Sequence, residues 1–419
     1  MLNRIFGKTV TWVITLGALV MALAMGVGYL GAFLSPEQHI HDFPIGIVNE
    51  DAGFSVLGQS QNKGDEAYAA ITAQDPERGD AIKWITYDSR DDLVAAMEKN
   101  ELYGGLVIPE DFTRNLVSIA EPQVTGGTSQ AATIEVLYNN GAGSLPSAQG
   151  KEIVNAAAQA VDARANGELL RRLQGQGTDV KPTMIPLVAN PVHIVETDLI
   201  PAGENTGHGM GAFYIAVVTT VGAFLAADIV SVGVDFVAGH TSMGRFMSRL
   251  RGETVPATPL QMFIAKFSLF TLAAIISSGL LTWFVVSIMG TPVAGSLQFF
   301  GVILLGMMAI GMLTLFLITL LSLPGILIGL LFTTILGVPS AFGIFPKEML
   351  PTVYQWLGEI LPVRYLSDAT RSLVFFDGRG GAGLTTGVQV LGAYAAISAV
   401  LAVVVAWIWT RWEVKEPIA

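Results

Sequence analysis

Apolar residues gather in long, nearly unbroken runs along much of this chain. A helix needs ~20 apolar residues to cross a hydrocarbon core of ~30 Å, and six runs reach that length. They lie at Thr9–Leu34, Ala212–Phe236, Met262–Met289, Leu297–Leu320, Pro324–Phe345 and Gly387–Trp409. The first run is longer than the ~7–15 residues of a signal-peptide core, which favours a retained helix. The pattern therefore predicts an α-helical polytopic membrane protein with six transmembrane helices.

Between the first and second runs the pattern changes, because residues 36–208 form the one large hydrophilic block. Short apolar segments followed by turn residues predict strands, and the helical segments between them favour a partly parallel sheet. The predicted strands are Phe43–Asn49, Ile82–Tyr87, Leu102–Ile108 and Thr133–Tyr138. Apolar residues recur at helical spacing over Gln149–Leu173, which predicts one long helix. We therefore expect an α/β extracytoplasmic domain inserted between membrane helices 1 and 2.

The chain accordingly divides into three predicted parts. Residues 1–35 hold the N-terminus and the first membrane helix, residues 36–208 hold the α/β domain, and residues 209–419 hold helices 2–6. Within the last part, residues 240–262 form a polar cytoplasmic loop. Residues 346–386 are amphipathic, and we expect two short helices there that lie on the outer membrane surface.

Positive charges orient the predicted helices. An even number of spans puts both termini on one side, and that side carries most of the basic residues near the spans. These are Arg4, Lys8, Arg245, Arg249, Arg251, Arg411 and Lys415. The positive-inside rule predicts that both termini are cytoplasmic, in a multi-pass protein of the plasma membrane. The segment 346–386 runs against this rule, because it also holds Lys347, Arg364, Arg371 and Arg379.

Composition supports a membrane protein and removes several other classes. Hydrophobic residues make up 52% of the chain and charged residues only 14%, against about 25% charged residues in soluble domains. A net charge of −11 argues against a nucleic-acid partner. The chain has no cysteine, which excludes disulfides and thiol chemistry.

The sequence shows no pattern typical of a catalytic site. It lacks GxxxxGK[ST], so any ATP hydrolysis by that route must come from a separate subunit. The five histidines form no HExxH pattern; His39, His41 and Asp42 could collect a metal, but this spacing is more often found in a solvated loop. We therefore expect neither enzymatic activity nor a cofactor or metal.

Two carboxylates fall inside the second apolar run. Asp228 and Asp235 are seven residues apart, so they share one face of a helix. Charges inside membranes are costly and often functional, which makes Asp228 the candidate intramembrane functional residue. Asp235 has two interpretations: it pairs with Lys266, or both residues simply lie at the cytoplasmic interface. Glycines within the runs predict close helix packing, at Gly306, Gly311, Gly325 and Gly329.

The loop after the second run is the candidate surface for a partner. Its candidate docking residues are Arg245, Arg249, Arg251 and Glu253. We expect a short cytoplasmic helix here that docks a partner protein; a basic membrane anchor is the alternative.

Four segments resemble a known family. They are Pro44–Gly53 (PIGIVNEDAG), Tyr103–Phe112 (YGGLVIPEDF), Pro259–Lys266 and Leu361–Arg371 (LPVRYLSDATR). Together with the order of the spans, they resemble the ABC-2 type membrane permeases, in particular their YhgE/Pip-like branch. The resemblance covers nearly the whole chain. One departure is Arg249–Glu253 (RLRGE), which lacks the acidic-arginine and Gly-Thr pattern of better-known exporters.

The resemblance implies a function and its partners. It implies a homodimeric permease subunit, surrounded by membrane lipids, that exports a lipid, drug or envelope polymer with a cytoplasmic ABC ATPase supplied in trans. The alternative is an envelope-surface interaction protein, similar to a phage receptor or a secretion accessory protein, whose external domain is a binding platform. Six spans with an intramembrane carboxylate are more than an anchor requires, which favours transport.

Overall fold

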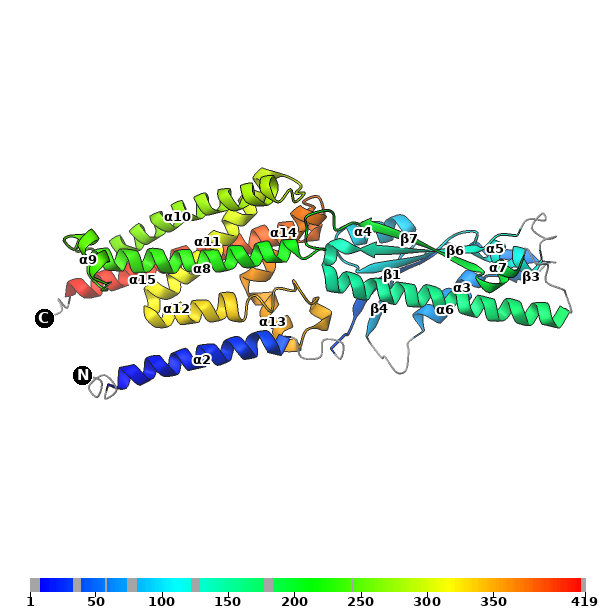
Figure 1. Ribbon diagram of the computed structural model, residues 1–419, viewed down its shortest axis with the longest axis horizontal. Coiled ribbons are helices and arrows are strands. Elements are labelled where there is room, and N and C mark those ends of the chain that lie inside the picture. The colour runs from blue at the N-terminus through cyan, green and yellow to red at the C-terminus, as the bar shows by residue number, and fades with distance from the viewer. Residues whose placement is uncertain are drawn as a thin grey trace. The chain divides into compact units, whose positions relative to one another are not determined.

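The computed structural model describes residues 8–32, 39–56, 59–73, 81–121, 129–176, 184–242 and 244–415 (Figure 1). The chain forms two compact units. A helical unit comprises Met1–His39 with Gly203–Ala419, and an α/β unit comprises Ile40–Ala202. Each unit is described separately below.

The α/β unit is built on a five-stranded sheet of order β4-β1-β5-β6-β7. Its strands are β1 (Phe43–Asn49), β4 (Ile82–Thr86), β5 (Gly104–Ile108), β6 (Ala132–Asn139) and β7 (Val192–Ile200). Strand β1 is parallel to both neighbours and β7 is parallel to β6, whereas β5 and β6 are antiparallel. The four predicted strands and the partly parallel sheet are confirmed. β7 was not predicted, and a small sheet of β2 (Phe54–Val56) and β3 (Gln59–Gln61) adds to the unit.

Helices complete the α/β unit. They are α3 (Lys63–Thr72), α4 (Arg90–Glu98), α5 (Phe112–Ala120), α6 (Ser144–Gln176) and α7 (Ile185–Ala189), with one 3-10 turn at Asn140–Ala142. The long helix predicted over Gln149–Leu173 is confirmed as α6. Side chains at the helix starts accept backbone N–H groups: Asn62 from Asp65 in α3, and Ser89 from Asp92 in α4.

Asp51 fixes the positions of two of these helices. Its carboxylate is buried just beyond β1 and accepts the backbone N–H of Gly64 at 2.9 Å and of Thr113 at 3.0 Å, and also the Thr113 hydroxyl. Gly64 lies in the first turn of α3 and Thr113 in the first turn of α5, so one side chain holds both helix N-termini against the strand end. A carboxylate is favourable there because helix N-termini carry partial positive charge.

The helical unit contains five helices that are long and apolar enough to cross a membrane, among the residues the structure describes. They are α2 (Thr9–Ala32), α8 (Gly211–Ala238), α10 (Pro259–Trp283) with its π turn η5 (Phe284–Ile288), α11 (Ser296–Leu321) and α15 (Leu384–Lys415). The shorter elements are α9 (Arg245–Arg251), α12 (Leu323–Leu330), η6 (Leu331–Ile335), η7 (Lys347–Met349), α13 (Thr352–Ile360), α14 (Pro362–Phe375) and η8 (Gly380–Ala382).

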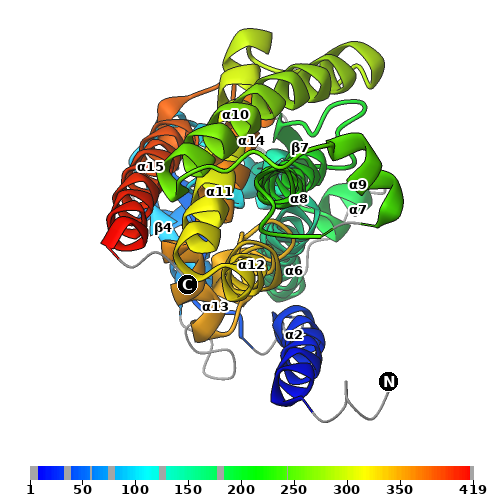
Figure 2. The ribbon, with the colours of Figure 1, turned by 90° about the vertical axis from the view of Figure 1, so that its left-hand side faces the viewer.

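Helix α11 is the centre of the helical unit. In its most apolar stretch 61% of the residues are buried, against 22% in that of α15 and 6% in that of α2. Figure 2 looks along the helices and shows α11 between α8, α10 and α15, with α2 to one side. Glycines allow the close approach: a Cβ at Gly311 would lie 1.9 Å from the Phe270 ring, and one at Gly306 would lie 2.5 Å from Leu366. Both contacts agree with the packing role predicted for these glycines.

The predicted span Pro324–Phe345 is not one continuous helix. The structure has eight α-helical residues in α12 and five in the π turn η6, followed by turns. At ~1.5 Å per residue this helix is ~20 Å long, too short for a core of ~30 Å. The expectation of six continuous membrane helices therefore does not hold for the described residues.

The same segment nevertheless runs the full length of the helical unit. Leu323 shares a cavity with Asp235 in the last turn of α8, while Val338 and Ala341 pack against Phe213 in its first turn. A chain that is half helix and half turns thus connects the two ends of α8. Successive long elements of the unit alternate in direction, in the order α8, α10, α11, this segment and α15 (Figure 1). The Thr9 end of α2 and the Lys415 end of α15 both lie at the end of the unit that carries α9.

The amphipathic stretch 346–386 contains the two predicted short helices, α13 and α14, which meet at Leu361 and Pro362. Helix α13 exposes Trp356. Helix α14, in contrast, buries Leu366, Ala369 and Leu373 in the same core as α11 and α15. The expectation of two surface-lying helices is therefore wrong for α14, because its apolar face packs against protein.

Candidate functional site

A buried ion pair joins two of the long helices. Lys266 of α10 approaches Asp235 in the last turn of α8, with Nζ and Oδ1 2.8 Å apart. The Lys266 side chain is only 8% exposed and that of Asp235 20%. Removing a charge from water costs several kcal/mol unless a partner of opposite charge compensates it. The pairing, one of the two interpretations that the sequence left open, is present.

A cavity of about 620 Å³ lies beside this pair. Its polar groups include those of Asp235, Lys266, His240 and Ser322, and Trp409 of α15 forms part of the wall. The other lining residues are mostly apolar and include Met262, Phe263, Ile318, Leu323 and Ile326. Ligand pockets typically have ~300–1,000 Å³ and combine apolar walls with a few polar groups. The cavity therefore suits an amphipathic molecule.

Asp228 lies apart from the ion pair. It is seven residues before Asp235 on α8, hence on the same face and ~10 Å away along the axis. It does not line the cavity beside Lys266. Its Oδ1 is buried and accepts no hydrogen bond from the described residues, and the same holds for the Ser231 hydroxyl one turn further on. Buried polar atoms without partners are rare in folded proteins, so Asp228 retains its place as the candidate intramembrane residue.

The predicted helix of the docking loop is present as α9. Phe246 and Leu250 are 73% and 67% exposed, and Arg249 and Glu253 are exposed beside them. This surface combines apolar side chains with charge, as protein interfaces do. For Arg245 the structure describes the backbone, which begins α9, and not the side chain.

Arg251 has a different role from its neighbours. Its Nη1 donates a hydrogen bond to the Phe236 carbonyl at 3.0 Å, and the guanidinium lies over the Phe236 ring, 4.6 Å from the centroid. The carbonyl belongs to the last turn of α8, where a cation is favourable. Arg251 therefore caps the end of α8 while remaining partly exposed, and its predicted role in docking stays a prediction.

A network of charges at the other end of the helical unit was not predicted. Glu359 bridges Lys347 (2.6 Å) and Arg364 (2.5 Å), and Asp368 lies 3.4 Å from Arg364 and 3.5 Å from Arg371. Arg371 Nη2 also donates to the Phe342 carbonyl at 3.2 Å. The network thus fastens α14 to the turns that follow η6.

A signal for part of this network was present in the sequence. Arg364 and Asp368 are at i,i+4 and Asp368 and Arg371 at i,i+3, the spacings at which opposite charges meet on a helix. No group of three or more metal-binding side chains occurs in the part of the chain that the structure describes.

Several long apolar helices, two of them joined by a buried ion pair, are typical of a multi-pass membrane protein. The sequence matches the model of the ABC-2 family transporter proteins over residues 8–411. The chain therefore belongs to this family, and the match extends over both units. No curated protein and no solved structure matches the sequence. Membership supports a permease component of an ABC exporter, and permeases of this kind generally work with an ABC ATPase.

Proposed function

We propose that the chain is the membrane-spanning permease subunit of an ABC-2 exporter of the YhgE/Pip-like branch. It moves a lipid, a drug or an envelope polymer, and a separate subunit hydrolyses ATP. The family match over residues 8–411 carries this proposal. The mixed apolar and polar walls of the cavity beside Asp235 and Lys266 support an amphipathic substrate.

The proposal includes six passes through the plasma membrane, with both termini in the cytoplasm and the α/β unit outside. The fifth pass is the discontinuous segment from α12 to the turns beside Phe213. Irregular backbone at membrane depth is tolerated where protein buries it, and Val338, Ser340 and Ala341 are buried. Helix α9, which carries Arg249 and Arg251, lies at the same end of the helical unit as the first residues of α2 and the last residues of α15. These positive charges support a cytoplasmic location for that end of the unit.

This topology is testable by single-cysteine labelling, because the natural chain has no cysteine. Lys151→Cys on α6 and Glu253→Cys after α9 place one thiol on each unit at exposed positions. A membrane-impermeant maleimide added to intact cells should label the first variant and not the second. Both should react after the cells are opened. Labelling of Glu253→Cys in intact cells would overturn the orientation.

We further propose that a cytoplasmic ABC ATPase docks on α9 through Arg249, Phe246 and Leu250. Arg249→Glu should lower the amount of ATPase that co-purifies at least tenfold, because like charges placed across an interface cost several kcal/mol. Lys151→Glu, an exposed charge reversal on the α/β unit, is the matched control and should retain the ATPase. Arg251→Glu should in addition lower thermal stability, since it removes the cap of α8. If no ATPase co-purifies with the intact protein, the surface interaction protein becomes the better proposal.

A homodimer completes the proposal. It follows from the resemblance to half-transporters, in which one copy supplies half of the transport path. The native mass of the protein in lipid nanodiscs should correspond to two copies, and a uniform monomer with export activity would contradict it.

A further inference from the structure

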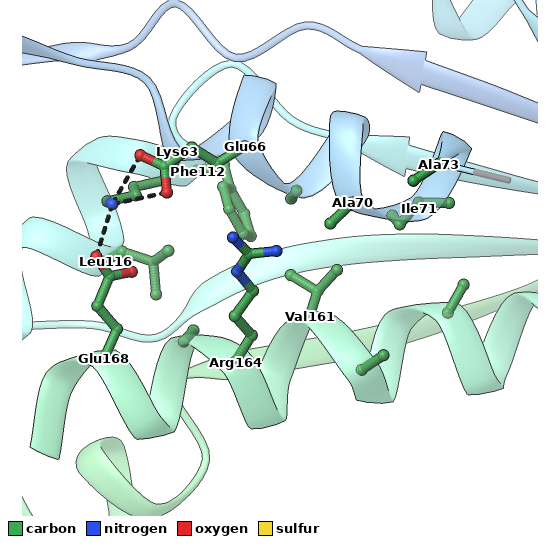
Figure 3. A pocket seen from close by; sticks show the side chains of 14 residues that line it. Lys63, Glu66, Ala70, Ile71, Ala73, Phe112, Leu116, Val161, Arg164 and Glu168 are labelled. Carbon is green, nitrogen blue, oxygen red and sulfur yellow. Dashed lines mark hydrogen bonds and ion pairs between the residues drawn. The ribbon is translucent and has the colours of Figure 1, made fainter. Parts of the chain in front are cut away.

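The α/β unit contains a cavity of about 350 Å³ between α3, α5 and α6. Helix α3 presents Lys63, Glu66, Ala67, Ala70 and Ile71, which recur at helical spacing and so share one face. Helix α6 presents Ala157, Ala160, Val161, Arg164 and Glu168, which likewise share one face. The two faces point toward each other across the cavity (Figure 3).

The floor of the cavity is apolar. The space exists because both facing helices carry alanine there, whose short side chains do not fill it. Ala67 and Ala70 of α3 lie opposite Ala157 and Ala160 of α6. Phe112 and Leu116 of α5 and Val161 of α6 close the floor. Asp51 holds the starts of α3 and α5 in place, so the walls of the cavity rest on a fixed framework.

One side of the cavity mouth carries charges that compensate one another. The Lys63 ammonium lies 2.8 Å from a carboxylate oxygen of Glu66 and 2.8 Å from one of Glu168. Arg172 adds a second cation 3.7 Å from Glu168. Burial acts to raise the pKa of Glu168, but the Lys63 ammonium holds that pKa below its usual value. Lys63 is therefore already bound within the protein.

Arg164 is different. Its guanidinium extends from α6 into the space between the helices, beside Phe112, and no dashed interaction reaches it in Figure 3. Among the residues that the structure describes, it is the one cation lining this cavity without an ion-pair partner within 4.0 Å. A cavity with an apolar floor thus has an uncompensated positive charge at its mouth.

We propose that this cavity binds an amphiphile with a single apolar chain and an anionic head group, the chain lying between α3 and α6 and the head group at Arg164. The small volume suits one chain, since it is near the lower end of the ~300–1,000 Å³ of ligand pockets. Arginine suits a carboxylate or a phosphate because its planar fork donates two parallel hydrogen bonds to either. The proposal does not depend on the transport function.

The test uses the full-length protein in phosphatidylcholine nanodiscs. The probe is a dodecanoate with a photoreactive terminal carbon, and crosslinked peptides are mapped by mass spectrometry. We expect labelling of the α3 and α6 peptides around Ala70 and Ala160, in addition to labelling of membrane helices by probe dissolved in the bilayer. The membrane labelling serves as an internal reference. Label confined to the helical unit overturns the proposal.

Four variants separate the chain site from the head-group site. Ala160→Trp fills the cavity and should abolish α3 and α6 labelling, with hydrogen exchange of the α/β unit confirming that it remains folded. Arg164→Gln should reduce labelling about tenfold, as expected for loss of a charged hydrogen bond, and Arg164→Lys should restore part of it. Arg171→Gln, an exposed arginine two turns along α6 and outside the cavity, is the matched control and should label normally.

Two further arms identify the head group and its source. A dodecanol probe of the same length lacks the anionic head group. It should label the cavity of the natural protein only as weakly as dodecanoate labels the cavity of Arg164→Gln. Equal labelling of the natural protein by both probes overturns the anionic head group. Photoreactive lysophosphatidylglycerol, which has one acyl chain, placed in the nanodisc tests supply from the membrane, and dodecanoate added to the medium tests supply from solution. Labelling of the cavity in either arm supports the proposal and shows which source it uses. Labelling that is unchanged by Ala160→Trp and Arg164→Gln contradicts it.

Discussion

Two ion pairs with similar geometry lie in very different surroundings. In the α/β unit, Arg90 at the start of α4 lies 2.6 Å from Glu135 of β6; in the helical unit, Lys266 lies 2.8 Å from Asp235. The Arg90 and Lys266 side chains are 39% and 8% exposed. Glu135 also accepts a second bond from Arg90, at 2.8 Å, and one from Thr197, at 3.0 Å. Lys266 has only Asp235 as an ion-pair partner among the described residues.

The difference lies in what replaces a lost partner. Water can solvate Glu135 or Arg90 when the other is removed, and exposed pairs are worth only ~0–1 kcal/mol. The Lys266 side chain is only 8% exposed and has no second ion-pair partner among the described residues, and breaking a buried pair costs ~3–5 kcal/mol. Distance alone therefore does not rank these interactions. In the α/β unit we expect the ion pair to make a small contribution to local stability, whereas in the helical unit we expect the pair between α8 and α10 to make a large one.

The largest expected effect is on the buried pair. Lys266→Gln leaves the Asp235 carboxylate without its partner and should lower the stability of the helical unit by ~3–5 kcal/mol. The measurement is the thermal unfolding midpoint of the purified protein in nanodiscs. The double variant Lys266→Gln with Asp235→Asn should recover most of the loss, because neither charge then remains buried.

A surface pair provides the control for that measurement. Lys151 and Glu196 lie 3.5 Å apart with side chains about half exposed, so Lys151→Gln should change stability by no more than ~0.5 kcal/mol. If Lys151→Gln and Lys266→Gln have equal effects, burial does not govern these pairs and the comparison fails.

The second prediction concerns Asp228, whose Oδ1 has no hydrogen-bond partner among the described residues. A carboxylate near the centre of a bilayer costs ~2.5–3.5 kcal/mol, so Asp228→Asn should leave assembly unchanged or make the protein more stable. If Asp228 serves transport, export in vesicles should fall about tenfold, equivalent to ~1.4 kcal/mol of activation free energy. Full export with normal assembly would assign Asp228 to packing.

The matched control for Asp228 is Thr220→Val on the same helix. The Thr220 side chain is buried, and its hydroxyl donates to the Ala216 carbonyl of its own helix at 2.8 Å. Its removal should therefore leave export unchanged. Loss of export in both variants would show a general sensitivity of α8 rather than a role for the carboxylate.

The long elements were predictable because a single strong constraint determines them. Crossing a membrane requires ~20 apolar residues, and α2, α8, α10, α11 and α15 lie where such runs occur. The Asp235–Lys266 pair was one of two interpretations of these charges, because a charge inside an apolar helix favours a partner. Strand β7 was missed because polar residues interrupt it, at His193, Glu196, Thr197 and Asp198. It pairs only with β6, at the edge of the sheet, so those side chains remain accessible to water.

Other features depend on packing between distant segments and leave no local pattern. The apolar run that forms α12 and η6 is long enough for a span, but the turns after Ile335 pack on Phe213 and Val363 instead of continuing as helix. Helix α14 has the amphipathic pattern of a surface helix, yet its apolar face meets α11. The cavity beside Arg164 exists because α3 lies opposite α6, whose facing residues are about ninety positions later in the chain.

The smallest expected effect is the pH dependence of the exposed pair. Hydrogen bonds from the Arg90 guanidinium hold the pKa of Glu135 below its usual value of 4.5. The unfolded chain therefore binds more protons than the folded one near that pH. The stabilisation is fully present above about pH 4.5 and is lost as the pH falls through the lowered pKa of the folded state. Its size is at most ~1 kcal/mol, because Arg90 is partly exposed and water screens the pair.

Hydrogen exchange of β6 and α4 peptides in the full-length protein, measured between pH 7 and pH 3 and corrected for intrinsic rates, tests this small effect. Glu135→Gln should remove part of the loss of protection at acid pH, since no carboxylate then titrates. Arg90→Gln should have a similar effect, because Glu135 then keeps nearly the same pKa in both states. Peptides of α8 and α10 should not respond to either variant. If the acid response persists in both variants, other carboxylates cause it, and the Arg90–Glu135 pair contributes even less than its partial exposure to water implies.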